Sequence, residues 1–223
     1  ESGKAHIAVD VRHLGDALGP VFELRPSGAG RQNYESSNRG LSVGLTDRDL
    51  YVRIDDKTEG TPRSVRLSFP AGAGFGSVSG ESARPGIANY FSGANPTAWI
   101  TGSPRFGAMR ADQVLPGIDL RLYPNSEGFE YDLLVQGGTA PDHIRIAFSG
   151  TDLVSLTDNG DIQLHVGDRI VTHRAPVVYA LVDRQRAPIS AYFRLVDADT
   201  VDIILDVPEA LGDSEIVVDP SIA

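Results

Sequence analysis

Cysteine is absent from the 223 residues of this chain, and methionine and tryptophan occur once each. Without thiols the chain forms no disulfide bond and no thiolate metal site. A globular chain of this length buries roughly 70% of its extended surface, so it can fold without such cross-links. The sequence also lacks any apolar run near the roughly 20 residues that span a bilayer as a helix. We therefore expect no membrane insertion.

Positive charge is scarce as well. Lysine and arginine number 20 against 30 aspartate and glutamate residues, which gives a net charge of −10 and a pI near 4.9. Binding to nucleic acid or to an anionic membrane surface requires clustered Lys and Arg, so the composition argues against both partners. High net charge keeps a protein soluble and favours a monomer.

Helical periodicity is almost missing, whereas apolar and polar residues alternate along most of the chain. Residues 41–45 and 50–54 alternate on either side of the turn 47–49, which predicts a hairpin. The run Val177–Val182 is apolar on both faces and predicts a central strand buried between layers. His13–Leu18 is a weak helix candidate. Further strands are predicted at 7–11, 65–69, 118–122, 129–133, 144–148, 153–156, 162–166, 189–195, 201–205 and 216–218.

About fourteen short strands with regular turn signals predict an all-β fold, an antiparallel β-sandwich with negligible helix. The segment Ala71–Gly86 is rich in Gly and Ser and predicts a loop. We place a boundary there between two packed β lobes, residues 1–83 and residues 84–223.

Several motifs follow one another in a fixed order, and together they resemble a known family. They are Asn89-Tyr90-Phe91-x-Gly-x-Asn-Pro-x-x-Trp99, Leu115-Pro116-Gly117-Ile118-Asp119-Leu120, Phe129-Glu130-Tyr131-Asp132, Ala140-Pro141-Asp142-x-Ile144-x-Ile146-x-Phe148-x-Gly150, Arg174-Ala175-Pro176-Val177-Val178-Tyr179 and Val217-Val218-Asp219-Pro220. The set is similar to a bacterial domain of unknown function that precedes β-propeller (SBBP-type) repeats in large secreted or surface proteins. The resemblance covers roughly residues 85–220 and implies a non-catalytic extracellular β module.

One carboxylate pair deserves comparison with catalytic sites. Glu130 and Asp132 share a strand face about 7 Å apart, near the separation expected in inverting glycosidases. The predicted hairpin register places Arg121 opposite one of them, and an Arg partner lowers a carboxylate pKa, which opposes a general-acid role. We favour a structural ion pair and predict no catalytic residue.

No metal or cofactor is predicted. His6, His13 and His143 are isolated, while His165 and His173 could approach across a hairpin and supply two zinc ligands, fewer than a site needs. The Asp-rich runs 158–161 and 197–199 are explained by turn chemistry without calcium. No Gly-x-Ser-x-Gly elbow is present.

The leading hypothesis is therefore a non-catalytic structural or interaction module of a larger bacterial protein, extracellular or at the cell surface. Its signal peptide would be absent from this chain, whose start, residues 1–4, is typical of a trimmed or tagged protein. Its partners would be adjoining domains of the same polypeptide, or a surface protein or glycan. The alternative is a carbohydrate-binding module that uses Tyr90, Phe91 and Trp99, and a glycan hydrolase comes third. Pro96 favours a chain reversal that buries the Trp99 indole in the sheet, so we predict an anchoring role over exposure.

Overall fold

The structure is a computed structural model, and it describes residues 20–27, 31–38, 41–54, 63–91, 94–125, 128–139 and 141–222. The predicted strand at 7–11 and the helix candidate His13–Leu18 lie outside these ranges. Within them the chain forms β-strands and two single-turn 3-10 helices, with no α-helix. The predicted all-β class is confirmed.

The elements in chain order are β1 (Phe22–Ser27), β2 (Arg31–Asn38), β3 (Leu41–Leu45), β4 (Asp49–Ile54), β5 (Arg63–Ser68), β6 (Ser77–Tyr90), η2 (Pro96–Ala98), β7 (Ile100–Leu115), β8 (Ile118–Pro124), β9 (Phe129–Val135), β10 (His143–Ser149), β11 (Leu153–Leu156), β12 (Ile162–Val166), β13 (Arg169–His173), β14 (Val177–Val182), β15 (Gln185–Leu195), β16 (Thr200–Asp206), η3 (Glu209–Leu211), β17 (Glu215–Asp219) and β18 (Ser221–Ile222).

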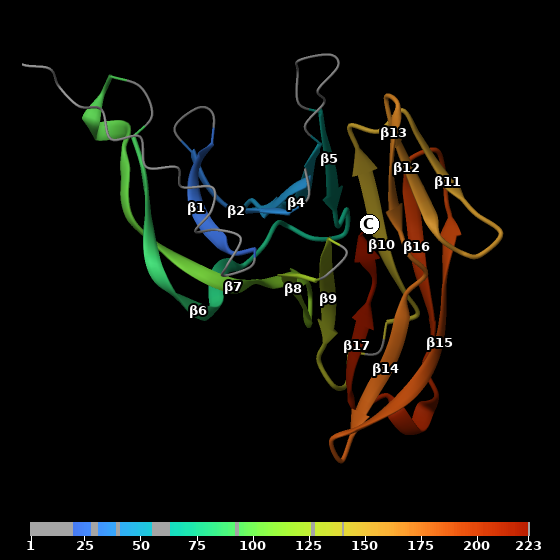
Figure 1. Ribbon diagram of the computed structural model, residues 1–223. Helices are drawn as coiled ribbons and strands as arrows, with labels where there is room; N and C mark the ends of the chain where they lie inside the picture. The colour runs from blue at the N-terminus through green and yellow to red at the C-terminus, as the bar shows by residue number, and fades with distance from the viewer. Residues whose placement is uncertain are drawn as a thin grey trace, which may run out of the picture.

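Figure 1 shows the strands. All pairs among the described strands are antiparallel, and thirteen of these strands form a closed circuit of pairings. The circuit runs β1-β2-β3-β4-β5-β10-β16-β15-β14-β17-β9-β8-β7 and returns from β7 to β1. β18 attaches β13, β12 and β11 to β9. Among the described strands, β6 pairs with β7 alone and β11 with β12 alone.

The core lies between layers of this sheet. In the C-terminal half, β11–β13 form one layer and β10 with β14–β16 form the other. His173 of β13 shows how they meet, because its ring lies 5.2 Å from Phe193 of β15 and 6.1 Å from Phe148 of β10, centroid to centroid. One cluster of buried apolar residues extends from Phe22 to Ile222, so residues from both predicted lobes share a single core. This layered packing agrees with the predicted sandwich.

Local turn chemistry explains why the predicted hairpins form. The Thr46 hydroxyl oxygen accepts the backbone N–H of Asp49 at 2.9 Å and closes the β3–β4 turn. Gly160 has φ +84° in the β11–β12 turn, a conformation that glycine adopts without strain. The β8–β9 register also agrees with the sequence pattern, because Leu120 faces Leu133 and Leu122 faces Tyr131.

Two predicted features are wrong. The segment Ala71–Gly86 is not a loop throughout, because β6 begins at Ser77 and runs past the proposed boundary at residues 83 and 84. Its Gly and Ser residues are held extended by pairing with β7, a partner that local composition does not reveal. Val177–Val182 is central in the sheet but covered on one face only, since Val177 is 61% exposed.

Candidate functional site

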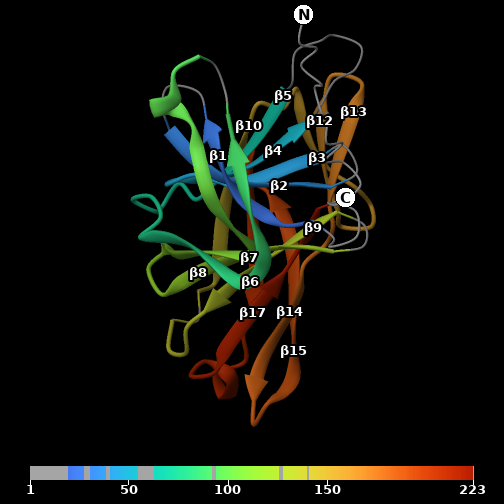
Figure 2. The same ribbon diagram turned by 60° about the vertical axis from the view of Figure 1, so that its left-hand side comes forward.

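The β6–β7 ribbon forms an arm that projects from the body of the protein (Figures 1 and 2). β1 pairs with β7 at Phe106, and beyond this point the ribbon continues toward η2. The β6–β7 register shifts within 84–90, and both strands carry a glycine with positive φ nearby, +89° at Gly86 and +70° at Gly102. Such irregularities bend and twist a ribbon. The arm is therefore a shaped, mostly exposed hairpin.

Two aromatic rings meet at the end of this arm. The Phe91 and Trp99 ring centroids lie 5.2 Å apart with an interplanar angle of 87°, an edge-to-face pair. Phe91 is 63% exposed and Trp99 is 38% exposed. The predicted burial of the indole in a sheet face is therefore wrong. The alternation of β7 gives the buried position to the next residue, Ile100.

Tyr90 has a different role from its two aromatic neighbours. Its hydroxyl donates a hydrogen bond to Glu23 of β1, and the Arg25 guanidinium lies over its ring, 5.7 Å from the centroid. Burial and the bond to Glu23 raise the pKa of Tyr90 to about 12, so the hydroxyl keeps its proton. Glu23 also accepts from Arg105 of β7 at 2.8 Å. Tyr90 therefore ties the arm to the body, whereas Phe91 and Trp99 form its tip.

Two asparagines beside these rings were not predicted. The Asn95 Oδ1 atom accepts the backbone N–H of Thr97 at 3.1 Å and its hydroxyl at 2.8 Å. Asn89 Oδ1 accepts the backbone N–H of Gly102 at 2.8 Å. Among the described residues nothing accepts from the side-chain N–H groups of either asparagine. A sequence signal does exist for this region, because residues 85–104 contain no Asp, Glu, Lys, Arg or His.

The carboxylate pair on β9 differs from the prediction in its electrostatics. Arg121 lies opposite Asp132 as expected, but its Nε atom bonds Glu81 of β6 at 2.8 Å instead. Asp132 accepts the Tyr123 hydroxyl at 2.9 Å and is 8% exposed. Burial raises the pKa of Asp132 to about 6, against the lowering by Tyr123 and Arg121. The predicted structural ion pair between Arg121 and this carboxylate is therefore wrong.

Asp202 shows what a buried carboxylate with cationic partners looks like in the same protein. It lies between Arg145 of β10 and Arg194 of β15. The Arg145 Nε atom is 2.8 Å from Oδ1 of Asp202, and the Arg194 Nη2 atom is 2.8 Å from Oδ2. Hydrogen bonds from Arg145 and then Arg194 lower the pKa of Asp202 to about 2. The two aspartates therefore have opposite shifts for opposite physical reasons.

His165 and His173 do not approach each other. His165 pairs with Ile170 and faces away from the core, where its Nε2 lies 3.2 Å from the Ser155 hydroxyl. His173 is buried, and its Nε2 lies 2.7 Å from the Tyr131 hydroxyl while its Nδ1 has no partner. Burial lowers the pKa of His173 to about 4, so the ring is neutral at pH 7. A single histidine in an alternating strand carries no local signal for such burial.

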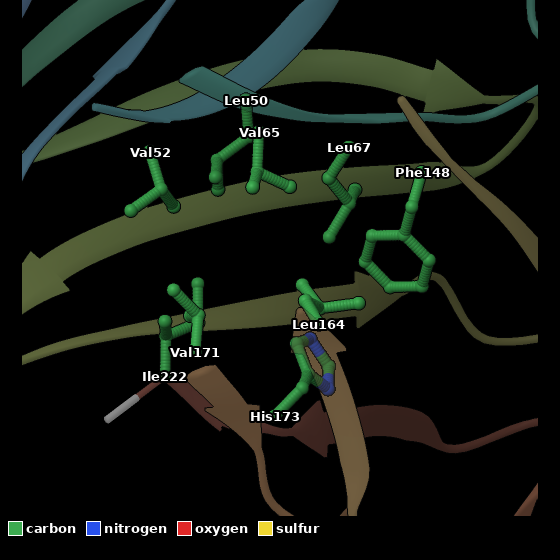
Figure 3. A pocket seen from close by; sticks show the side chains of 9 residues that line it. All are labelled: Leu50, Val52, Val65, Leu67, Phe148, Leu164, Val171, His173 and Ile222. Atoms are coloured by element: carbon green, nitrogen blue, oxygen red, sulfur yellow. The ribbon is translucent and has the colours of Figure 1, made fainter. Parts of the chain in front are cut away.

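Two hollows among the described residues lie away from the β9 carboxylates. The first is an apolar cavity in which the centre of a water molecule can occupy about 10 Å³, so it has room for about one water molecule (Figure 3). It is lined by His173 together with Leu50, Val52, Val65, Leu67, Phe148, Leu164, Val171 and Ile222. The second, about 190 Å³, lies between the β3–β4 turn and the loop after β5 and includes Phe69 and Phe75.

With the arm and its tip described, comparison with known proteins gives the family. A family described as a domain of unknown function, DUF7948, matches residues 30–221. The chain belongs to this family. No curated protein and no solved structure matches it. The DUF7948 match runs from β2 to the first residue of β18, so the arm and its tip lie within the family region.

The described part of this DUF7948 domain contains no group of three or more His, Asp or Glu side chains arranged to hold a metal ion. None of its helices is long and apolar enough to cross a membrane. Among the exposed aromatic residues of the described part, Phe91 and Trp99 contact each other as a ring pair.

Proposed function

We propose that this DUF7948 domain is a non-catalytic interaction module of a larger bacterial protein, extracellular or at the cell surface, and that the tip of the β6–β7 arm is its contact surface. The exposed Phe91–Trp99 pair carries this proposal. Exposed aromatic side chains at a projecting tip are typical of contact sites, and Trp is among the residues that dominate binding energies.

The attachment of the arm supports this role. The Tyr90–Glu23–Arg105 hydrogen bonds hold the base of the tip against β1. A contact surface that is fixed before binding loses less conformational entropy when a partner docks. The arm would present the tip away from the body, next to adjoining domains such as β-propeller repeats.

The catalytic alternative depends on Glu130 and Asp132. A carboxyl pKa of about 6 suits a general acid. However, Asp132 is nearly inaccessible, and its Oδ1 atom already accepts the Tyr123 hydroxyl. The burial of Asp132 restricts the approach of a substrate to this carboxylate, and this favours a module without catalysis.

Binding of the full-length protein to the envelope of its source cells tests the proposal. We expect the double variant Phe91→Ala/Trp99→Ala to lose most of the binding, because both rings of the tip are removed. The matched control is Leu153→Ala/Ile170→Ala, which removes exposed apolar side chains from the opposite part of the chain. Equal binding by the tip variant and the wild type would show that the tip is not the contact surface.

A further inference from the structure

We propose that the arm tip binds an uncharged polysaccharide by stacking a pyranose ring in the corner between Phe91 and Trp99. This inference rests on the proposed function and names the ligand class for the same site. Three observations carry it: the geometry of the ring pair, the amide donors on the same segment, and the absence of charged residues from that segment.

The ring pair forms a corner. At an interplanar angle of 87° the two rings stand perpendicular, so one ring can serve as a floor and the other as a wall. Phe91 keeps nearly two-thirds of its surface accessible. The C–H face of a pyranose is apolar while its rim carries hydroxyls, and aromatic faces favour ligands of this amphipathic kind. A corner of this form accommodates one sugar ring of a chain.

Hydrogen-bond donors lie on the same segment as the corner, two residues before Phe91 and four before Trp99. Asn89 and Asn95 each use the carboxamide oxygen inside the arm, which fixes the side chain and leaves its N–H groups for an external acceptor. Sugar hydroxyl oxygens are such acceptors. Because internal bonds already orient both amides, a ligand that accepts from them gains a hydrogen bond with little further ordering.

The chain segment that carries the corner has no charged side chain of its own, and the nearest charges described are Glu23, Arg25 and Arg105 around Tyr90. The chain is 22% charged, yet residues 85–104 include no Asp, Glu, Lys, Arg or His. At the average frequency this stretch would contain about four charges. Acidic polysaccharides and phosphorylated ligands are recognised through Arg and Lys. Their absence from residues 85–104, in a protein of net charge −10, favours a neutral glycan over an acidic one.

Affinity electrophoresis of the 223-residue chain tests the inference. Gels would contain neutral glucans, mannans, xylans or galactans, or acidic alginate or heparin as the charged probes. We expect at least one neutral polysaccharide to retard the wild-type protein, and Trp99→Ala and Asn95→Asp each to weaken this binding about tenfold or more. Ionic binding weakens as the salt concentration rises from roughly 50 to 500 mM. Retardation that stays the same over this range would agree with an uncharged contact.

The matched control is Tyr192→Ala, which removes an exposed aromatic ring from β15 and should leave retardation unchanged. Circular dichroism and melting curves confirm that each variant is folded. The inference is overturned if no neutral polysaccharide retards the wild type, if acidic polymers bind more tightly, or if Tyr192→Ala weakens binding as much as Trp99→Ala. If binding to the envelope depends on the tip but no glycan binds, glycan recognition is contradicted and the tip contacts a protein. The proposed function would then still hold.

Discussion

Replacing Asp132 by Asn should stabilise the protein at neutral and alkaline pH. Burial raises the pKa of this carboxyl from 3.8 to about 6, so the folded state binds its proton more tightly than the unfolded state. Stability contributed by that proton is present below pH 3.8 and is lost as the pH rises through 6. At 1.36 kcal/mol per pKa unit the loss is about 3 kcal/mol above pH 6. Asn resembles the neutral acid in shape and still accepts from Tyr123.

The expected result is a gain approaching about 3 kcal/mol in the free energy of unfolding at pH 8, which shrinks toward zero near pH 3.5. Urea denaturation at both pH values, with equal m-values for variant and wild type, provides the measurement. Asp202→Asn is the matched control, because its pKa of about 2 reflects the Arg145 and Arg194 hydrogen bonds. The stability contributed by the ionised Asp202 is present above pH 3.8 and is lost as the pH falls through 2. Asp202→Asn should therefore lower the free energy of unfolding by up to about 2 kcal/mol at pH 8.

Two results would refute this reasoning. If Asp132→Asn leaves the free energy of unfolding at pH 8 unchanged or lowers it, the ionised carboxylate must be solvated or paired with a cation, contrary to the burial described here. If the gain is the same at pH 3.5 and pH 8, the effect of the substitution is not electrostatic.

Three further predictions concern single residues. In the Asp132→Asn variant, the free energy of unfolding should fall by up to about 3 kcal/mol as the pH is lowered from 6.5 to 4. The reason is that burial lowers the pKa of His173 from 6.5 to about 4, so that the unfolded chain takes up the proton first. An NMR titration of His173 with a midpoint above pH 6 would contradict this. Trp99→Ala should change the free energy of unfolding by no more than about 1 kcal/mol, and wild-type emission should be that of a partly solvated indole, whereas a loss of several kcal/mol would indicate burial. Tyr90→Phe removes the hydrogen bond to Glu23 and should raise proteolytic cleavage within 85–104 while the core remains folded; unchanged cleavage would show that this bond does not hold the arm.

The sequence predicts the strands best where one face of a strand is buried. Residues 41–45 and 50–54 alternate, and they form the predicted hairpin of β3 and β4. The prediction failed where a distant partner decides the structure. The Ser- and Gly-rich part of β6 is a strand because β7 pairs with it, and the apolar outer side of β14 has no layer over it.

The candidate site was predicted only in part. The aromatic residues of the tip were found because they are rare and close together in the chain. Their roles were not, since the alternation of β7 buries Ile100 and leaves Trp99 at the surface. His173 and Asp132 occupy ordinary strand positions, and only tertiary burial perturbs their pKa values.

The closed circuit of strands can be completed only after the C-terminal strands have been synthesised. β9 pairs with β8 nearby in the chain, but its other edge is completed by β17 and β18, which end at Ile222. A ribosome or export channel that releases the chain from its N-terminus delivers β9 some eighty residues before these partners. Until they emerge, β9 presents an unpaired edge of the kind that promotes association between chains. Deletion of the last ten residues should leave this edge open permanently and turn a protein that folds into one that aggregates.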